Sequence, residues 1–295
     1  MTLDDAIHVV REGADLYVEQ VGPAEAPAVL FLHGGPGASS HAFRELMGED
    51  LESYRMLYAD QRGGGRSYAD TPFDLDALAD DVAAVCRALD VRRVTLLAHG
   101  FGAAVAVRTG LRHPELVRGH VWLNPWLSMP MLARTLQRQA AVLSRRPNEA
   151  LPPESALGDS DSDVDLDPEA LVDTAFGWFG AKPLFDALWF PDTAARLRLE
   201  HAESTVLLGP SESAGLATPW RIEVLDELRQ CTMPVAVLVA TGDASSYPDQ
   251  AEAALALLPH AVTALLPGGH HPYLDEPDTF LGALAAALTH VGTGT

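Results

Sequence analysis

Apolar and polar residues alternate near the start of the chain and then give way to short apolar runs. Residues 7–11 and 16–20 alternate around Glu12-Gly13, which predicts a β-hairpin. The run at residues 235–241 shows no alternation, as expected for a strand that is buried on both faces of a sheet. Further strands are expected over residues 28–32, 55–59, 94–98, 119–123 and 261–266. The chain therefore predicts eight strands.

Helical periodicity separates most of these strands. Residues 75–89 place one apolar stripe on a single side of a helix: Leu75, Leu78, Ala79, Val82, Val85, Cys86 and Leu89. Further helices are expected from about residue 102 to Arg112 and over residues 249–258 and 278–289. Strands that alternate with helices after the second strand predict a mostly parallel, doubly wound α/β sheet.

The alternation stops between Asn124-Pro125 and Met233-Pro234. Residues 126–230 carry helical patterns, broken by prolines between 147 and 153 and by an acidic run at 158–165, which we interpret as a solvated loop. We expect residues 126–230 to form a helical cap over the carboxyl ends of the strands, where open α/β sheets bind ligands. Residues 1–125 and 231–295 would then form the core domain.

Residues 94–105 combine a buried strand, a sharp turn and the start of a small-residue helix. This is the setting of a nucleophile elbow, whose usual pattern is G-x-S-x-G. Here Ala98 and Gly102 take the two glycine positions, and Gly100 stands at the centre, where the nucleophile is expected. Glycine has no side chain and cannot attack a substrate. Taken alone, the stretch also fits an ordinary left-handed turn, because glycine accepts positive φ without steric penalty.

Four motifs in one order favour the elbow over the ordinary turn. They are His33-Gly34-Gly35-Pro36-Gly37, Asp60-Gln61-Arg62-Gly63-x-Gly65-Arg66-Ser67, the elbow itself, and Gly269-His270-x-Pro272-x-x-Asp275-x-Pro277-x-x-Phe280. Their order resembles the proline iminopeptidase branch of the α/β-hydrolase family, and the match covers nearly the whole chain outside the expected cap. The resemblance implies an α/β-hydrolase fold with an eight-stranded, mostly parallel sheet and an inserted helical cap. We expect Arg62 and Arg66 to tie loops together.

The resemblance also implies a catalytic histidine and its acid. His270 matches the family's histidine, and the spacing to the following prolines favours it over His271. The family's acid position holds Ser245, so Asp243, two residues earlier, is the candidate that would orient the imidazole of His270. The alternative is that Asp243 is only a turn residue after a strand.

Backbone donors and a substrate pocket are implied next to these side chains. By resemblance, the N–H groups of Gly35 and Phe101 form an oxyanion hole, which stabilises negative charge developing on a substrate oxygen. Both donors are backbone groups, so a glycine at the elbow does not remove them. Gly34, His99 and Trp126 are the residues that we expect to contact substrate.

Specificity for an amino-terminal proline depends, in that family, on cap carboxylates that recognise the free amine. The candidates in this chain are Asp173, Glu200, Glu203 and Glu212. Each of them also fits an ordinary carboxylate on a helix surface.

The charge and cysteine content of the chain limit the kinds of molecule that it is expected to bind. The 20 Lys and Arg residues against 41 Asp and Glu give a net charge of −21, which argues against binding nucleic acid or anionic membranes. The two cysteines, Cys86 and Cys231, have no spacing typical of a metal site or disulfide framework. The acidic start lacks the features of a signal peptide, so we expect a cytoplasmic protein that acts on a small-molecule or peptide-like substrate. No cofactor or metal is expected.

Three functions remain open on this pattern. The first, which we favour, is an enzyme that uses His270 and the oxyanion donors without a serine nucleophile. It would catalyse epimerisation, elimination, cyclisation or rearrangement of a small acyl or peptide-like substrate. The second is a proline iminopeptidase-like amide or ester hydrolase inactivated by a serine-to-glycine change at position 100. The third is a non-catalytic ligand-binding protein. Because the acid position departs from the family as well, the first is favoured over the second.

Overall fold

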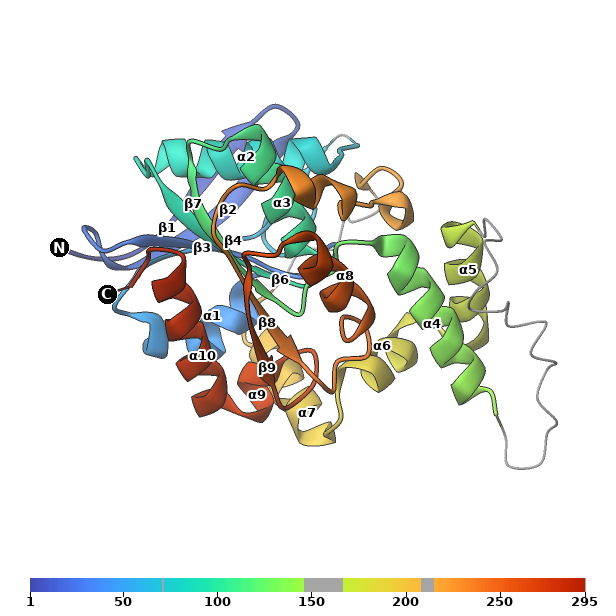
Figure 1. The fold of residues 1–295 in the computed structure, drawn as a ribbon. Helices are drawn as coiled ribbons and strands as arrows, with labels where there is room; N and C mark the ends of the chain where they lie inside the picture. The colour runs from blue at the N-terminus through green and yellow to red at the C-terminus, as the bar shows by residue number, and fades with distance from the viewer. Residues whose placement is uncertain (71, 146–166, 208–214, 295) are drawn as a thin grey trace.

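The computed structural model describes residues 1–70, 72–145, 167–207 and 215–294. A sheet crosses the molecule, and helices pack on both of its faces and gather at one end (Figure 1). The strands are β1 Thr2–Arg11, β2 Ala14–Pro23, β3 Ala28–Leu32, β4 Arg55–Ala59, β5 Tyr68–Ala69, β6 Val94–His99, β7 Val117–Leu123, β8 Val235–Ala240 and β9 Val262–Leu266. The helices are α1 His41–Met47, α2 Leu75–Ala88, α3 Gly102–Arg112, α4 Met129–Leu143, α5 Pro168–Phe179, α6 Ala181–Trp189, α7 Thr193–Glu203, α8 Asp249–Leu257, α9 Pro272–Asp275 and α10 Pro277–His290, with 3-10 turns at η1 Glu49–Leu51, η4 Pro219–Arg221 and η5 Asp226–Gln230.

The strand order is β1-β2-β4-β3-β6-β7-β8-β9, and the two-residue β5 pairs with β2 beside this path. The neighbours from β4 through β9 pair in parallel, whereas β1 with β2 and β2 with β4 are antiparallel. The expected eight-stranded, mostly parallel sheet is confirmed. The hairpin of β1 and β2 turns at Glu12-Gly13 as predicted, but both of its strands are longer than the alternating segments.

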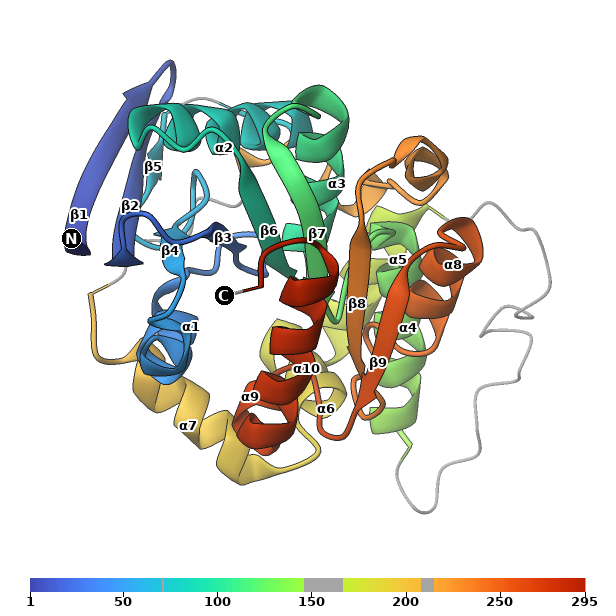
Figure 2. The same cartoon turned by 60° about the vertical axis from the view of Figure 1, so that its left-hand side comes forward.

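Burial explains why the apolar runs became strands. Every residue of β3, β6 and β8 is buried, because helices cover the sheet on both sides. Figure 2 shows α2 and α3 on one side of the sheet and α1 and α10 on the other, and the two sides bury separate apolar clusters. The short helix α1 was not predicted, because its seven residues give too few turns for a periodic signal.

The segment between β7 and β8 is a helical insert made of α4, α5, α6 and α7. Its described residues add no strand to the sheet. The division at residues 126 and 230 into a cap domain and a core domain stays a prediction. The acidic run at 158–165 and the prolines from 147 to 153 lie outside the described residues. None of the described helices has the length and hydropathy needed to cross a bilayer.

The two arginines of the second motif tie loops together, as expected. The guanidinium of Arg62 donates from Nε and Nη2 to the carboxylate of Asp81 on α2, both at 2.6 Å. Arg66 Nε donates to Asp60 at 2.7 Å, and the same guanidinium pairs with Glu19 on β2. These buried pairs fix the loop after β4 against the sheet and α2.

His120 on β7 is a buried histidine whose ring lies among apolar packing. It is fully buried, and neither ring nitrogen has a hydrogen-bond partner within the described part of the chain. A Cβ on Gly110 of α3 would lie 2.8 Å from His120 Nε2, so the helix packs directly on the ring. Burial lowers the pKa of His120 to about 4.

Acid should therefore unfold the protein partly through His120. Below the unfolded pKa of 6.5, the unfolded chain takes up a proton that the folded ring refuses, so stability falls between pH 6.5 and about 4. The loss attributable to this ring amounts to as much as about 3 kcal/mol. We predict that His120→Leu flattens this part of the pH dependence in urea unfolding, whereas the exposed His260→Gln leaves it unchanged. An unaltered pH slope in the His120→Leu protein would contradict the prediction.

Candidate functional site

The turn after β6 has the geometry of an elbow. Gly100 has φ of +52°, and α3 begins two residues later at Gly102. A Cβ at position 102 would lie 2.3 Å from the carbonyl oxygen of Leu32, so the start of α3 can pack on β3 only with glycine there. This close packing points residue 100 toward the loops at the carboxyl edge of the sheet.

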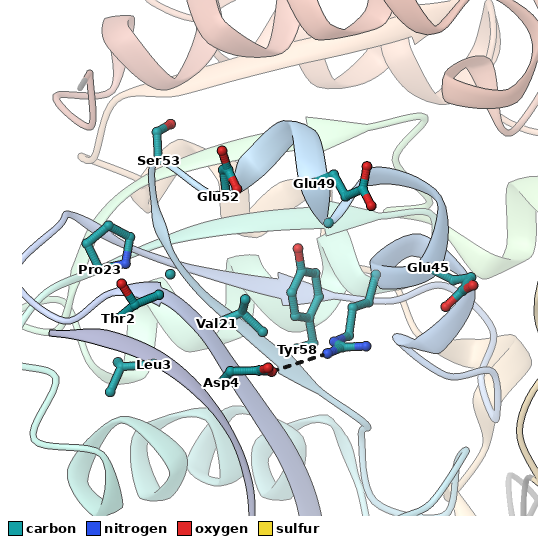
Figure 3. A pocket seen from close by; sticks show the side chains of 13 residues that line it. Thr2, Leu3, Asp4, Val21, Pro23, Glu45, Glu49, Glu52, Ser53 and Tyr58 are labelled. Carbon is teal, nitrogen blue, oxygen red and sulfur yellow. Dashed lines mark ion pairs between the residues drawn. The ribbon is translucent and has the colours of Figure 1, made fainter.

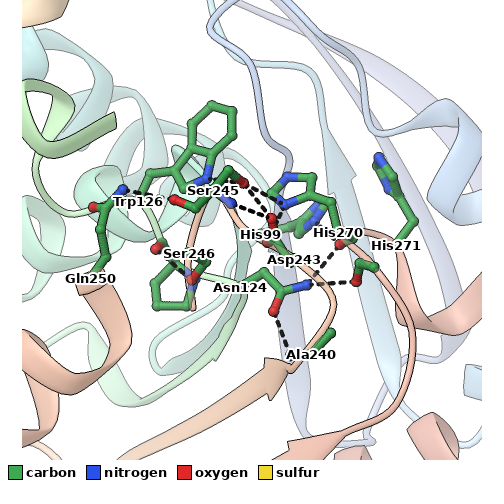
Figure 4. Close-up of polar contacts among 12 residues, drawn as sticks. His99, Asn124, Trp126, Ala240, Asp243, Ser245, Ser246, Gln250, His270 and His271 are labelled. Atoms are coloured by element: carbon green, nitrogen blue, oxygen red, sulfur yellow. Dashed lines mark hydrogen bonds and ion pairs between the residues drawn. The ribbon is translucent and has the colours of Figure 1, made fainter. Parts of the chain in front are cut away.

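His270 and Asp243 meet Gly100 at this edge. The Nδ1 of His270 lies 2.7 Å from Asp243 Oδ2, which makes it the protonated nitrogen that donates to the carboxylate. The other nitrogen, Nε2, lies 3.3 Å from the position that a Cβ on Gly100 would take. Asp243 follows β8 and His270 follows β9, and Figure 4 shows the two side chains next to each other. Strand ends that are far apart in sequence therefore bring both residues to Gly100.

Ser245 and Trp126 support the carboxylate. The backbone N–H of Ser245 donates to Asp243 Oδ1 at 2.9 Å, and its hydroxyl donates to the same oxygen at 2.5 Å. The indole Nε1 of Trp126 in turn donates to Ser245 Oγ at 3.1 Å. The serine at the family's acid position thus orients the aspartate two residues earlier, and both residues are almost fully buried.

The main chain of His270 is held by three groups. Its N–H donates to the carbonyl of Trp189, the last residue of α6, at 2.9 Å. Its carbonyl oxygen accepts hydrogen bonds from Asn124 Nδ2 and His99 Nε2, each at 2.9 Å. A Cβ on Gly269 would lie 1.9 Å from the Trp189 carbonyl oxygen, so only glycine permits this approach of the insert.

Two further histidines, His99 and His271, lie next to His270 but have different contacts. The His271 ring forms a hydrogen bond from Nδ1 to the Tyr273 hydroxyl at 2.7 Å and stacks on Phe190, so it does not face Gly100. Burial, followed by the nearby His270, lowers the pKa of His99 well below its usual value. Burial and the two neighbouring imidazoles lower the pKa of His271 in the same way. Both rings therefore stay neutral at pH 7.

The two expected oxyanion donors flank the elbow. Phe101 follows Gly100 directly, and a Cβ on Gly100 would lie 3.7 Å from the Cα of Gly34, next to Gly35. Across the described residues, the N–H groups of Gly35 and Phe101 form no hydrogen bond to a protein acceptor. Two unpaired amides next to one turn suit an electron-rich oxygen of a ligand.

A cavity of about 440 Å³ lies between these loops and the insert. Most of its wall is aromatic or apolar, and it is formed by Gly35, Pro36, Trp126, Met129, Phe176, Ala181, Phe185, Trp189, Pro219 and Trp220. Of the residues expected to contact substrate, Trp126 lines this cavity, whereas Gly34 and His99 do not. His99 is 4% exposed, and its ring packs against the rings of His270 and His271. Its contact with substrate stays a prediction.

The carboxylates proposed for recognising a free amine lie elsewhere. Glu200 accepts from Lys182 at 2.9 Å on the surface of the insert. Asp173 and Glu203 are exposed on their helices, and Glu212 lies outside the described residues. None of the described carboxylates lines the cavity.

A larger hollow of about 640 Å³ lies beside the hairpin, away from His270. It is lined by residues of β1, β2, α1 and η1 together with Ser53 and Tyr58, and Asp4 pairs there with Arg44 at 3.7 Å (Figure 3). It contains none of the residues that the motifs single out. Within the described ranges, no cluster of three or more His, Cys, Asp or Glu side chains has the geometry to hold a metal ion.

Asn124, Trp189 and Gln250 are site residues that the motifs did not reveal. Asn124 directly follows β7 and has φ of +45°, and an asparagine before a proline after a strand is the signal that could have indicated it. Gln250 on α8 accepts through Oε1 from the N–H groups of Leu127 and Ser128, at 2.7 and 2.8 Å, and so fixes the start of the insert. No local pattern marks Gln250 or Trp189, because their partners lie far away along the chain.

Comparison with known proteins agrees with this geometry. A family model described as the alpha/beta hydrolase fold matches residues 27–162. The chain is 24% identical over 269 residues to a proline iminopeptidase of Heyndrickxia coagulans, covering 89% of this chain and 91% of that protein. The crystal structure of a proline iminopeptidase-related protein from Thermus thermophilus is 34% identical, with a TM-score of 0.81 over 98% of both chains. Proline iminopeptidase from Mycobacterium smegmatis shares the fold at 20% identity, with a TM-score of 0.72 over 97% of this chain and 98% of that chain.

Asn124 gives a direct test of how the site is held. Its side chain also donates to the Gly269 carbonyl at 3.2 Å and accepts from the Ala240 N–H at 2.7 Å. Because buried partners would be left unpaired, we predict that Asn124→Gly lowers the free energy of unfolding by about 2–4 kcal/mol. Glycine keeps the left-handed backbone without strain, so Asn124→Ala should lose about 1 kcal/mol more. Equal stability of the Asn124→Gly and native proteins in urea unfolding would refute this role.

Proposed function

Because this chain belongs to the α/β-hydrolase family and is proline iminopeptidase-like, we propose that it is an enzyme that uses His270 as a general acid and base on a small carbonyl compound. No covalent intermediate with the protein forms. One observation carries the proposal: His270 Nε2 faces the backbone of Gly100 at the elbow, 3.3 Å from where a Cβ would stand, and the described residues place no nucleophilic side chain among the atoms nearest to that position.

Ser245 does not replace the nucleophile. Its hydroxyl lies 3.5 Å from His270 Nδ1, which is the nitrogen on the Asp243 side of the ring, and it already donates to the Asp243 carboxylate. A serine nucleophile must instead meet the nitrogen that faces the substrate. Ser245 is therefore a positioning residue for Asp243.

Proton transfer next to a carbonyl fits the remaining groups. His270 Nε2 removes a proton from the carbon beside the carbonyl, and the C–H electron pair forms a carbon–carbon double bond. The carbonyl π pair moves to oxygen, where the Gly35 and Phe101 N–H groups stabilise the enolate. Asp243 stabilises the imidazolium through Nδ1. The imidazolium then returns its proton to another carbon of the conjugated system, to a departing group, or to the same carbon once the enolate has turned its other face to Nε2. These outcomes are rearrangement, elimination and epimerisation.

Hydrolysis by an activated water is the second candidate. The resemblance to the Heyndrickxia coagulans protein, which carries the name of a peptidase and matches over 91% of its length, favours it. A water at the position of a Gly100 side chain would meet His270 Nε2, which would take its proton as the oxygen attacks a carbonyl. This route also forms no bond to the protein, so the two candidates share His270 but differ in product.

We predict that a fluorophosphonate probe, which requires an activated serine, does not label the native protein. Gly100→Ser should become labelled at position 100, because its hydroxyl would come within reach of His270 Nε2. The gain in labelling rate should exceed about a hundredfold, as expected for a serine paired with a histidine base. Adding His270→Ala to Gly100→Ser is the matched control and should abolish labelling. Labelling of the native chain would contradict the proposal.

Deuterium exchange tests the reaction itself. In D₂O, the native protein should introduce deuterium at the carbon beside the carbonyl of accepted acyl compounds, which NMR detects without knowledge of the product. His270→Ala should slow this exchange by about 10²–10⁴-fold. Cleavage to an acid without exchange would support the activated water instead. Full activity of the His270→Ala protein would contradict both candidates, and the absence of exchange and of cleavage in the native protein would leave a binding protein.

A further inference from the structure

The cavity beside the site is lined mostly by aromatic and apolar side chains. One face of α6 presents Ala181, Phe185 and Trp189 to it, four residues apart each time, which places all three on the same side of the helix. Across from them stand Trp126 from the start of the insert and Gly35 from the first motif. The cavity therefore joins the insert to one of the expected oxyanion donors.

The aromatic rings continue from the cavity to the base. Phe185 lies 4.6 Å from Trp189, measured between ring centroids, and Trp189 stacks on His270 at 4.9 Å with 13° between the planes. Trp126 also stacks on His270, at 5.2 Å. A ligand in the cavity thus contacts the same indole rings that contact the imidazole. Gly35, one of the expected oxyanion donors, lines the cavity, whereas His270 does not.

Charged groups are absent from the described wall of this cavity. On α6, Lys182 and Asp186 lie one position beyond the lining residues, on another side of the helix, and pair with each other at 3.5 Å. An ammonium group in the cavity would lose hydration and gain no carboxylate from the described wall. Contact with the aromatic rings returns only about 2 kcal/mol of that loss, so its burial is unfavourable.

We propose that this cavity selects uncharged carbonyl compounds with a bulky apolar group, and that it excludes the free amino end of a peptide. The inference rests on the proposed function for the position of the carbonyl, but its basis is the wall of the cavity rather than His270. A volume of about 440 Å³ lies in the range of small-molecule sites and accepts an aromatic acyl group.

A matched pair of ligands tests the proposal by binding alone. The two ligands, 3-phenylpropanamide and phenylalaninamide, differ only in the α-amine, which is largely protonated at about pH 6.5. Trp126, Trp189 and Trp220 line the cavity, so quenching of intrinsic fluorescence reports occupancy, and calorimetry confirms it. We expect 3-phenylpropanamide to bind the native protein at least about tenfold more tightly than phenylalaninamide.

Two variants test whether the ligand binds in this cavity. Phe185→Ala should weaken binding of 3-phenylpropanamide by about three- to tenfold through lost apolar contact. Trp178→Ala on α5 is the control, since this side chain is 49% exposed and does not line the cavity, and it should leave the affinity unchanged. Tighter binding of phenylalaninamide, equal affinities, or no binding of either ligand would overturn the inference.

The binding result can be distinguished from the result for the proposed proton transfer. The same pair is measured on the His270→Ala protein, where no proton transfer is expected. Preference for the uncharged amide there, without deuterium exchange in the native protein, would support the inference and contradict the proposed reaction. Preference for phenylalaninamide together with His270-dependent exchange would do the reverse.

Discussion

The peptide units around His270 are held from three directions, and the position of the imidazole depends on them. The Trp189 carbonyl receives the His270 N–H from the insert, while Asn124 and His99 donate to its carbonyl from the ends of β7 and β6. All of these groups are buried or nearly so, where an unpaired backbone group is costly. The sheet and the insert therefore set the place of the base before its side chain makes any contact.

The buried Asp243 carboxylate determines which nitrogen of His270 carries the proton. The Asp243 carboxylate is fully buried and accepts from His270, from the Ser245 hydroxyl and from the Ser245 N–H, so its charge is matched by donors on both oxygens. With Nδ1 bound to this carboxylate, the lone pair of the imidazole is left on Nε2, which faces Gly100. Little water reaches the pair, and fixed dipoles such as the Gly35 and Phe101 amides act more strongly in such surroundings.

Local sequence signals predicted the parts of the molecule whose causes are local. Apolar runs gave the strands, and glycine-rich motifs at strand ends indicated where Gly100 and His270 would meet. The choice of Asp243 over a simple turn residue could not be made from the sequence, because it depends on the path of the loop after β8. Asn124 and Trp189 were missed for a related reason, since each acts on a peptide unit that is distant in the chain, 146 residues away for Asn124 and His270. The aromatic cavity depends on how the insert packs, which its helical periodicity does not determine.

The insert and the loop that carries Gly269 and His270 depend on each other, although they lie far apart in the chain. Glycine is the only residue type at position 269 that leaves room for the Trp189 carbonyl, and the end of α6 supplies the acceptor for the His270 N–H. Inserts exchanged between relatives of this chain, by recombination or in the laboratory, must therefore carry an α6 of matching length. A shorter α6 would leave the His270 N–H without its acceptor. A side chain at position 269 would clash with the carbonyl of Trp189 even if the exchanged insert folded correctly. Substitutions of side chains that face the cavity leave this joint intact, whereas a side chain at residue 269 or a change in the length of α6 does not.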